Sequence, residues 1–138
     1  MIVIVCLDET GGMLFHHRRQ SRDRAVTGKI QKLGKEKKLW MNSYSYSLYK
    51  DMGNVEISVS EDFLFRAGEG ELCLVETEQL KQVEEKIEEL IAFRWDKKYP
   101  ADFYLDLDLS KWERTGIEEF CGTSHEKIRL ECYKGESL

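Results

Sequence analysis

The sequence predicts one α/β domain with a mostly parallel central sheet, helices on both faces of the sheet and an antiparallel hairpin at its C-terminal end. Two observations support this fold class. Short apolar runs typical of strands alternate with segments of helical spacing, and the last two strand-like runs are separated by a loop instead of a helix. The chain of 138 residues also has the usual length of one domain, so residues 1–138 are expected to share one fold.

The N-terminal part of the chain predicts a central strand, a loop and a helix. Residues Ile2–Leu7 form an unbroken β-branched and aliphatic run, which is typical of a strand buried on both faces. A Gly-Gly turn leads to residues 13–21, whose lack of regular spacing predicts a polar, basic loop. A helix is expected next, with Ser21 as its N-cap and Gly34 at its C-terminal end. The apolar residues on one face of this helix are Ala25, Val26, Ile30 and Leu33.

The rest of the chain continues the alternation. A short helix is expected over residues 43–51, and Thr77 is expected to cap a helix that carries Leu80, Val83 and Ile87 on one face. The last two predicted strands are joined by a Gly-containing loop, which favours an antiparallel hairpin. The strands predicted after the first one are residues 38–42, 55–60, 72–75, 89–95, 112–121 and 127–133.

Composition narrows the class of protein. Apolar residues make up 41% of the chain and charged residues 34%, which is typical of a globular domain, and the longest apolar run is far shorter than the roughly 20 residues of a membrane span. We expect a cytoplasmic protein with reduced cysteines, because the four cysteines show no C-x-x-C spacing. A net charge of −5 argues against nucleic acid as a partner.

The order of these elements resembles dihydrofolate reductase. The first strand and Gly11-Gly12-Met13 match that family's opening strand and loop, and Asp23 falls where the family carries its acidic pterin-binding residue. The resemblance covers most of the chain and implies a single-domain, three-layer dihydrofolate reductase-like fold. The segments that match in the later part are residues 72–75, the helix after Thr77, residues 89–95, Tyr99-Pro100-Ala101-Asp102-Phe103, Leu109-Ser110-Lys111-Trp112-Glu113 and the final hairpin.

The positions that match the family's cofactor site depart from its pattern. The family binds the NADPH pyrophosphate on a Gly-Gly pair at a strand end, where backbone N–H groups approach the phosphates. Val75-Glu76-Thr77 stands there in this chain, and Glu76 would place a negative charge against a phosphate. Asn42-Ser43 replaces a Gly-Arg pair, and residues 50–71 are too few for one strand and helix of the cofactor side. We therefore expect no cofactor, with NADPH as the alternative.

The chain also resembles short bacterial proteins that often carry the label ribonuclease Z. The matching segments are Arg18-Arg19-Gln20-Ser21-Arg22-Asp23 and Ser124-His125-Glu126-Lys127. Ribonuclease Z is a two-zinc hydrolase whose ligands come from an H-x-H-x-D-H cluster with further His and Asp residues. This chain has three histidines, His16, His17 and His125, and no H-x-H, so we expect no metal site.

Residues 16–24 are the most unusual segment, with four arginines and two histidines in an acidic protein. If the segment borders a cleft at the helix start, guanidinium groups and free N–H groups could hold a phosphate or carboxylate. The alternative is a solvated loop with structural Arg–Asp pairs. The candidate ligand-binding residues are Arg18, Arg19, Gln20, Arg22 and Asp23.

Asp23 and His125 each have a functional and a structural interpretation. Asp23 is the one weak catalytic candidate, because the resemblance implies a carboxylate that hydrogen-bonds a heterocycle; the alternative is a first-turn Asp favoured by the helix dipole. His125 lies beside an acidic residue in the predicted hairpin loop. We expect it to be a surface or capping residue, since the chain contains no G-x-S-x-G motif.

Three functions are compatible with the sequence. The favoured one is a binding or regulatory module with a dihydrofolate reductase-like fold that has lost NADPH binding and takes a small anionic ligand or a protein partner. The alternative is a divergent NADPH-dependent reductase. The third, suggested by the ribonuclease Z label, is a nuclease.

Overall fold

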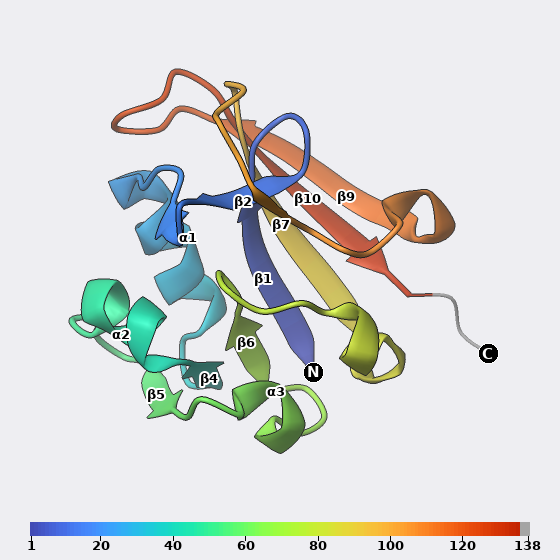
Figure 1. The fold of residues 1–138 in the computed structure, drawn as a ribbon. Helices are drawn as coiled ribbons and strands as arrows, with labels where there is room; N and C mark the ends of the chain where they lie inside the picture. Colours follow the sequence, from blue (N-terminus) through green and yellow to red (C-terminus); the bar gives the residue numbers. More distant parts are fainter. Residues whose placement is uncertain (136–138) are drawn as a thin grey trace.

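The computed structural model describes residues 1–135 and confirms the predicted fold class (Figure 1). Its elements in chain order are β1 (Ile2–Leu7), β2 (Gly12–Phe15), β3 (Arg18–Arg19), α1 (Arg24–Leu33), β4 (Lys38–Met41), α2 (Ser43–Tyr49), β5 (Glu56–Val59), α3 (Phe63–Arg66), β6 (Leu72–Leu74), the 3₁₀ helix η1 (Lys81–Lys86), β7 (Glu89–Trp95), β8 (Phe103–Tyr104), the 3₁₀ helix η2 (Leu109–Lys111), β9 (Glu113–Phe120) and β10 (Ile128–Lys134).

The central sheet has seven strands in the order β5-β4-β6-β1-β7-β10-β9. The first five run parallel, whereas β10 is antiparallel to both β7 and β9. The predicted C-terminal hairpin is therefore confirmed, with Ile128 opposite Phe120 at its loop end. Because five neighbouring strands are parallel, their carboxyl ends meet at one edge of the sheet.

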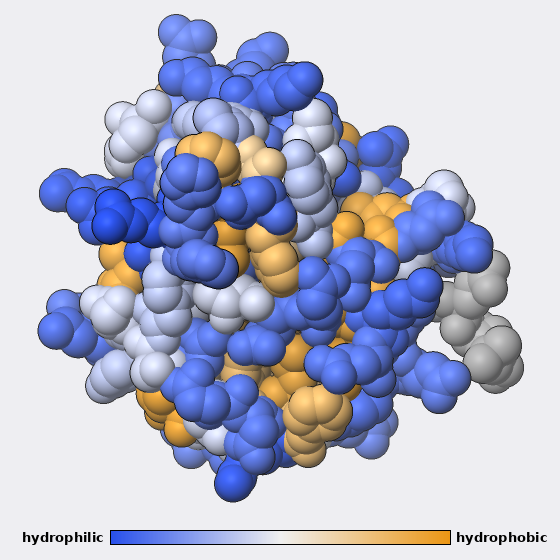
Figure 2. Space-filling model, in the orientation of Figure 1, coloured by the Kyte–Doolittle hydropathy of each residue, from blue (hydrophilic) through white to orange (hydrophobic). Residues whose placement is uncertain are grey.

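Strand β1 is central and buried on both faces, as predicted. Val3, Val5 and Leu7 belong to one apolar core, and Ile4 belongs to the other. Helices α1 and α2 contribute to the core that contains Ile4, while α3 and η1 contribute to the opposite one, so the sheet is the middle of three layers. Each fully buried aliphatic side chain stabilises the fold by roughly 1.5–3 kcal/mol. Figure 2 shows polar side chains over most of one face, with apolar side chains in small separate patches.

The basic segment that was predicted to be an irregular loop is instead a β-hairpin. Strands β2 and β3 pair antiparallel, and β2 also pairs with β8, which forms a second sheet of three short strands. The N–H of Asp102 donates to the carbonyl of Leu14, and the N–H of Leu105 donates to that of Gly11. These partners are distant in sequence, so local spacing could not predict the pairing.

Helix α1 begins later than predicted. Asp23, in an extended conformation, is its N-cap and accepts a hydrogen bond from the N–H of Ala25 at 2.8 Å. Ser21, the predicted cap, lies outside the helix, and its hydroxyl contacts His125. The predicted end is confirmed, because Gly34 is the C-cap.

The segment after Thr77, which was predicted to be an α-helix, forms none. The segment forms the 3₁₀ helix η1, although Leu80, Val83 and Ile87 are buried as expected. The carboxylate of Asp106 accepts hydrogen bonds from the N–H groups of Leu80 and Lys81 and anchors the start of this segment. The hydroxyl of Thr77 pairs with Asn42. The four cysteines, all within residues 1–135, are free thiols.

Two glycines in open space should respond oppositely to replacement by alanine. A Cβ added at Gly28, inside α1, or at Gly11, in a turn with φ of 83°, meets no atom within 4 Å. Gly28→Ala should raise the free energy of unfolding by about 0.5–1 kcal/mol, because alanine favours the helix. Gly11→Ala should lower it by about 1 kcal/mol, because its φ is left-handed. Urea unfolding of both variants checks this, and the same sign for both would contradict it.

Candidate functional site

The carboxyl edge of the parallel strands is where α/β folds bind their ligands. Asp8 follows β1, Asn42 follows β4, residues 75–77 follow β6 and Asp96 follows β7. Polar groups of this chain therefore converge where a cofactor would be expected. Their hydrogen bonds determine whether the edge is open.

Glu76 at this edge is paired with Arg19. The Nε and Nη2 atoms of Arg19 lie 2.8 and 3.0 Å from the two carboxylate oxygens, and the hydroxyl of Ser45 donates to the same carboxylate at 2.8 Å. The exposed fractions of the Arg19 and Glu76 side chains are 22% and 10%. The guanidinium also stacks on the ring of Tyr44, 4.6 Å from its centroid. The hydrogen bond with Glu76 raises the pKa of Arg19 despite its burial.

This ion pair closes the strand end. The remaining space among Cys6, Met13, Arg19, Val75 and Glu76 has a volume of about 10 Å³, which is at most room for one water. Arg19 was predicted to bind a ligand, but its Nε and Nη2 atoms already donate hydrogen bonds to Glu76. Glu76 was predicted to repel a phosphate, and in the fold its charge is balanced by the chain itself.

The neighbouring strand ends are tied together in the same way. The side-chain oxygen of Asn42 accepts from the N–H of Ser45 and caps α2, while its amide nitrogen donates to the hydroxyl of Thr77 at 2.7 Å. Asn42 stands where the resemblance placed a glycine, and Thr77 belongs to the predicted degenerate cofactor segment. Both side chains therefore have structural partners at this edge.

Gln20, another predicted ligand-binding residue, also contacts this edge. Its amide donates to the carboxylate of Asp8 and to the carbonyl of Pro100. Burial acts to raise the pKa of Asp8, but hydrogen bonds from Gly12, Thr10 and Tyr99 outweigh it, and the pKa lies below its ordinary value. Asp8 therefore stays ionised and holds the β1–β2 turn.

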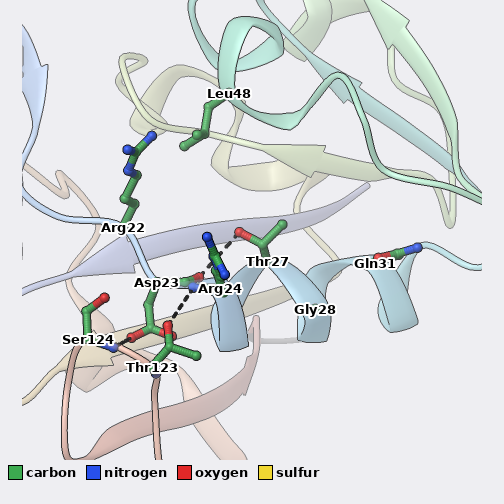
Figure 3. A pocket seen from close by; sticks show the side chains of 9 residues that line it. All are labelled: Arg22, Asp23, Arg24, Thr27, Gly28, Gln31, Leu48, Thr123 and Ser124. Carbon is green, nitrogen blue, oxygen red and sulfur yellow. Dashed lines mark hydrogen bonds between the residues drawn. The ribbon is translucent and has the colours of Figure 1, made fainter.

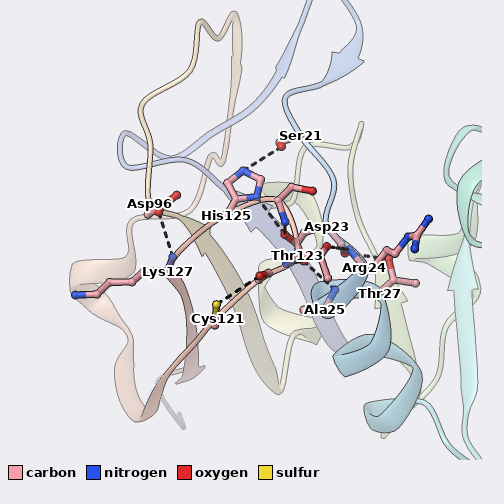
Figure 4. Close-up of polar contacts among 12 residues, drawn as sticks. Ser21, Asp23, Arg24, Ala25, Thr27, Asp96, Cys121, Thr123, His125 and Lys127 are labelled. Carbon is pink, nitrogen blue, oxygen red and sulfur yellow. Dashed lines mark hydrogen bonds and ion pairs between the residues drawn. The ribbon is translucent and has the colours of Figure 1, made fainter.

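His125 is buried, which corrects the expectation of a surface or capping residue in the hairpin loop. Its side chain is 2% exposed and stacks on Trp95 with ring centroids 4.5 Å apart. Its Nδ1 lies 3.3 Å from Oδ2 of Asp23, and its Nε2 lies 3.1 Å from the hydroxyl of Ser21 (Figure 4). The same Nε2 lies 2.9 Å from the hydroxyl of Tyr99. The hairpin loop is thus joined to the start of α1.

Asp23 accepts hydrogen bonds from both segments. Besides Ala25 and His125, the backbone N–H groups of Thr123 and Ser124 donate to its carboxylate at 3.0 and 2.7 Å. Burial acts to raise the pKa of Asp23, but these donors more than offset it and hold the pKa well below its ordinary value. Its carboxylate oxygens already have several donors from the chain itself. Asp23 is therefore the N-cap of α1, not the first-turn residue that the structural alternative expected.

Three arginines of the basic segment remain exposed and form what we call the arginine groove, defined by Arg18, Arg22 and Arg24. Arg18 and Arg22 line a pocket of about 310 Å³ with Tyr44. Arg22 and Arg24 line a second, open pocket of about 780 Å³ between α1 and α2. Within residues 1–135 these three guanidinium groups form no ion pair. Figure 3 shows Arg22 extending toward Leu48 of α2.

The histidines do not gather into a metal site. His16 and His17 lie in the β2–β3 turn, both with positive φ, and His16 stacks on Phe15. His125 is buried beside Asp23. Among residues 1–135, no three His, Cys, Asp or Glu side chains converge as metal ligands. No helix in this part of the chain is long and apolar enough to cross a membrane.

Comparison with known proteins establishes the fold. No family model and no curated protein matches the chain. A solved structure of dihydrofolate reductase from Enterococcus faecalis, complexed with NADP(H) and RAB-propyl, superimposes with a TM-score of 0.70 at 10% sequence identity. The match covers 99% of this chain and 96% of that one. This protein therefore has a dihydrofolate reductase-like fold, as the order of its elements predicted.

Several residues of the site were not predicted from the sequence to belong to it. Ser45 and Tyr44 complete the surroundings of the Arg19–Glu76 pair, and Tyr99 and Ser21 complete those of His125. Their contacts join residues that are far apart in the chain, so no local spacing could have indicated them.

Replacing Asp23 should destabilise the protein in a pH-dependent way. Asp23→Asn should lower the free energy of unfolding by about 1–3 kcal/mol near neutral pH, because buried N–H groups lose a charged acceptor. The folded pKa lies below the unfolded value of about 3.9, so the carboxylate stabilises fully above that pH and progressively less below it.

Urea unfolding near neutral and at acidic pH measures this difference. The difference in the free energy of unfolding between wild type and Asp23→Asn should become smaller at acidic pH. The control is Asp51→Asn, which changes an exposed carboxylate after α2 and should leave the free energy of unfolding nearly unchanged at both pH values. A difference that stays constant with pH would show that the charge of Asp23 does not stabilise the fold.

Proposed function

We propose that this protein is a binding module for a small anionic ligand and that its cofactor cleft is no longer used. The observation that carries the proposal is the arginine groove. In a chain of net charge −5, three exposed guanidinium groups without ion-pair partners in residues 1–135 line two pockets that share Arg22. Guanidinium groups in this state are available to bind a phosphate or carboxylate in a bidentate way.

The lining of the groove suggests what kind of ligand it takes. Thr27 and Gln31 of α1 add polar groups beside the arginines, and Leu48 of α2 adds an apolar contact. Pockets of this size accommodate small molecules. The ligand proposed is therefore a small phosphate or carboxylate compound with an apolar part, in preference to a protein partner.

The loss of NADPH binding is supported by the Arg19–Glu76 pair. A diphosphate at the end of β6 would have to displace the guanidinium of Arg19 and then face the carboxylate of Glu76. Leaving a partly buried carboxylate without its partner costs several kcal/mol. The alternative of a divergent reductase rests on the likeness to a reductase fold, and a cofactor titration distinguishes it.

Anion binding should depend on the arginine groove. Pyrophosphate, titrated by calorimetry at low ionic strength, should bind wild type saturably. Arg22→Ala should weaken the affinity by about 10- to 100-fold, because one charged hydrogen-bonding group contributes about 1.5–3 kcal/mol. Arg18→Ala should act in the same direction.

Arg66→Ala is the matched control, because Arg66 is exposed on α3 and pairs only with Asp62 four residues away. Its affinity for pyrophosphate should equal that of wild type. Equal affinities for Arg66→Ala and Arg22→Ala would contradict the proposed groove, and so would the absence of saturable binding to wild type.

A titration with NADPH tests the closed cleft. Tryptophan fluorescence reports on this region, because Trp95, one of the three tryptophans, lines the remaining space at the strand ends. We expect the phosphates of NADPH to reach only the arginine groove. Any saturable change in the fluorescence of wild type should therefore be absent in Arg22→Ala. Saturable binding of NADPH that survives Arg22→Ala would support the reductase alternative.

A further inference from the structure

Three side chains near the start of α1 are arranged as a nucleophile, a base and an acid. The hydroxyl of Ser21 lies 3.1 Å from Nε2 of His125, and Nδ1 of His125 lies 3.3 Å from Oδ2 of Asp23. Figure 4 shows the imidazole between the other two groups. A serine hydroxyl, an imidazole and a carboxylate in this order form the unit that activates serine in many unrelated hydrolases.

The hydrogen bonds determine where the protons lie. Asp23 accepts from the N–H groups of Ala25, Thr123 and Ser124, so its carboxylate is held in the ionised form and can only accept. The Nδ1 atom of His125 must therefore carry a proton, and in the neutral ring Nε2 presents its lone pair to the hydroxyl of Ser21. Stacking on Trp95 keeps the ring in this orientation.

Ser21 also borders solvent. It is half-buried and lines the smaller pocket of the arginine groove together with Arg18 and Arg22. A substrate in this pocket would meet the hydroxyl on one side and positive charge on the other. The hydroxyl of Tyr99, 2.9 Å from the same Nε2, competes with Ser21 for the lone pair.

We propose that Ser21 and His125 are catalytic residues that hydrolyse a small carboxylic ester, with Asp23 as the positioning residue of the imidazole. Oγ of Ser21 bonds to the carbonyl carbon while its proton passes to Nε2 of His125. The ester C–O bond breaks, and the alcohol leaves with that proton. Water then attacks the acyl-serine in the same way, gives its proton to His125, and releases the acid as the Ser21 hydroxyl is restored.

The preferred substrate is an ester with a second, anionic group. This preference, unlike the reactivity of Ser21, rests on the proposed function of the arginine groove. Arg18 and Arg22 would hold the anionic group and stabilise the negative charge that develops on the carbonyl oxygen.

A fluorophosphonate probe tests the nucleophile with no contribution from the groove. The full-length protein should form one covalent adduct as Oγ of Ser21 displaces fluoride, and peptide mass spectrometry should locate it on Ser21. Ser21→Ala should not be labelled, and His125→Gln should be labelled at least about 100-fold more slowly. The control is Ser110→Ala, whose hydroxyl contacts only Asp108, and it should be labelled like wild type.

Two further variants test the roles assigned to Tyr99 and Asp23. Tyr99→Phe removes the competing hydroxyl, so the labelling rate should rise, whereas a fall would contradict the assignment of Nε2 to Ser21. Asp23→Asn should slow labelling and shift its pH profile, because the proton on Nδ1 is no longer held. Absence of labelling in folded wild type, or an adduct on another residue, would overturn the proposal.

Hydrolysis rates distinguish this proposal from that of the groove. Wild type should hydrolyse p-nitrophenyl acetate, and mono-p-nitrophenyl succinate faster, with Arg22→Ala losing about 10-fold of that preference. Ester hydrolysis without this preference would support the triad and reject the arginine groove as the site that holds the anionic group of the substrate. Pyrophosphate binding without serine labelling would reject the triad alone.

Discussion

The position of the basic segment depends on the ion pair between Arg19 and Glu76. The Glu76 carboxylate follows β6, which lies between β4 and β1, and is only slightly exposed, so it requires a cation from the same chain. Arg19 supplies that cation with both arms of its guanidinium, and Ser45 adds a third donor. The pair draws β3 over the strand ends and thereby closes the edge at which this fold class binds its ligands.

The same contact orients the residues that follow Arg19. Gln20 contacts Asp8 beneath the hairpin, and Asp23 turns into the interior, where it joins α1 to the C-terminal hairpin through His125. Arg18, Arg22 and Arg24 are left on the outside. One short segment thus covers the strand ends with part of its side chains and presents positive charge to the outside with the others.

The apolar pattern of the chain was sufficient for most of the fold. The strand Ile2–Leu7 was predictable because burial on both faces requires an unbroken apolar run. Helix α2 was predictable because Tyr46 and Tyr49 are three residues apart, which is a helical spacing. Two predictions failed for a shared reason. Strand β2 of the hairpin pairs with β8, and the start of η1 is hydrogen-bonded to Asp106. Both partners are distant in sequence from the segments that they stabilise. Local spacing does not contain such contacts.

The sequence by itself determined the fold class, the surplus of arginine near α1 and the presence of a carboxylate at the end of β6, because these follow from composition and from residue order. Only the tertiary structure decided which charges are paired. Arg19 meets Glu76 across 57 residues, and Asp23 meets His125 across 102. Each pairing requires the strands to be assembled first, since a charged side chain selects its partner by distance and burial, and neither is encoded in neighbouring residues.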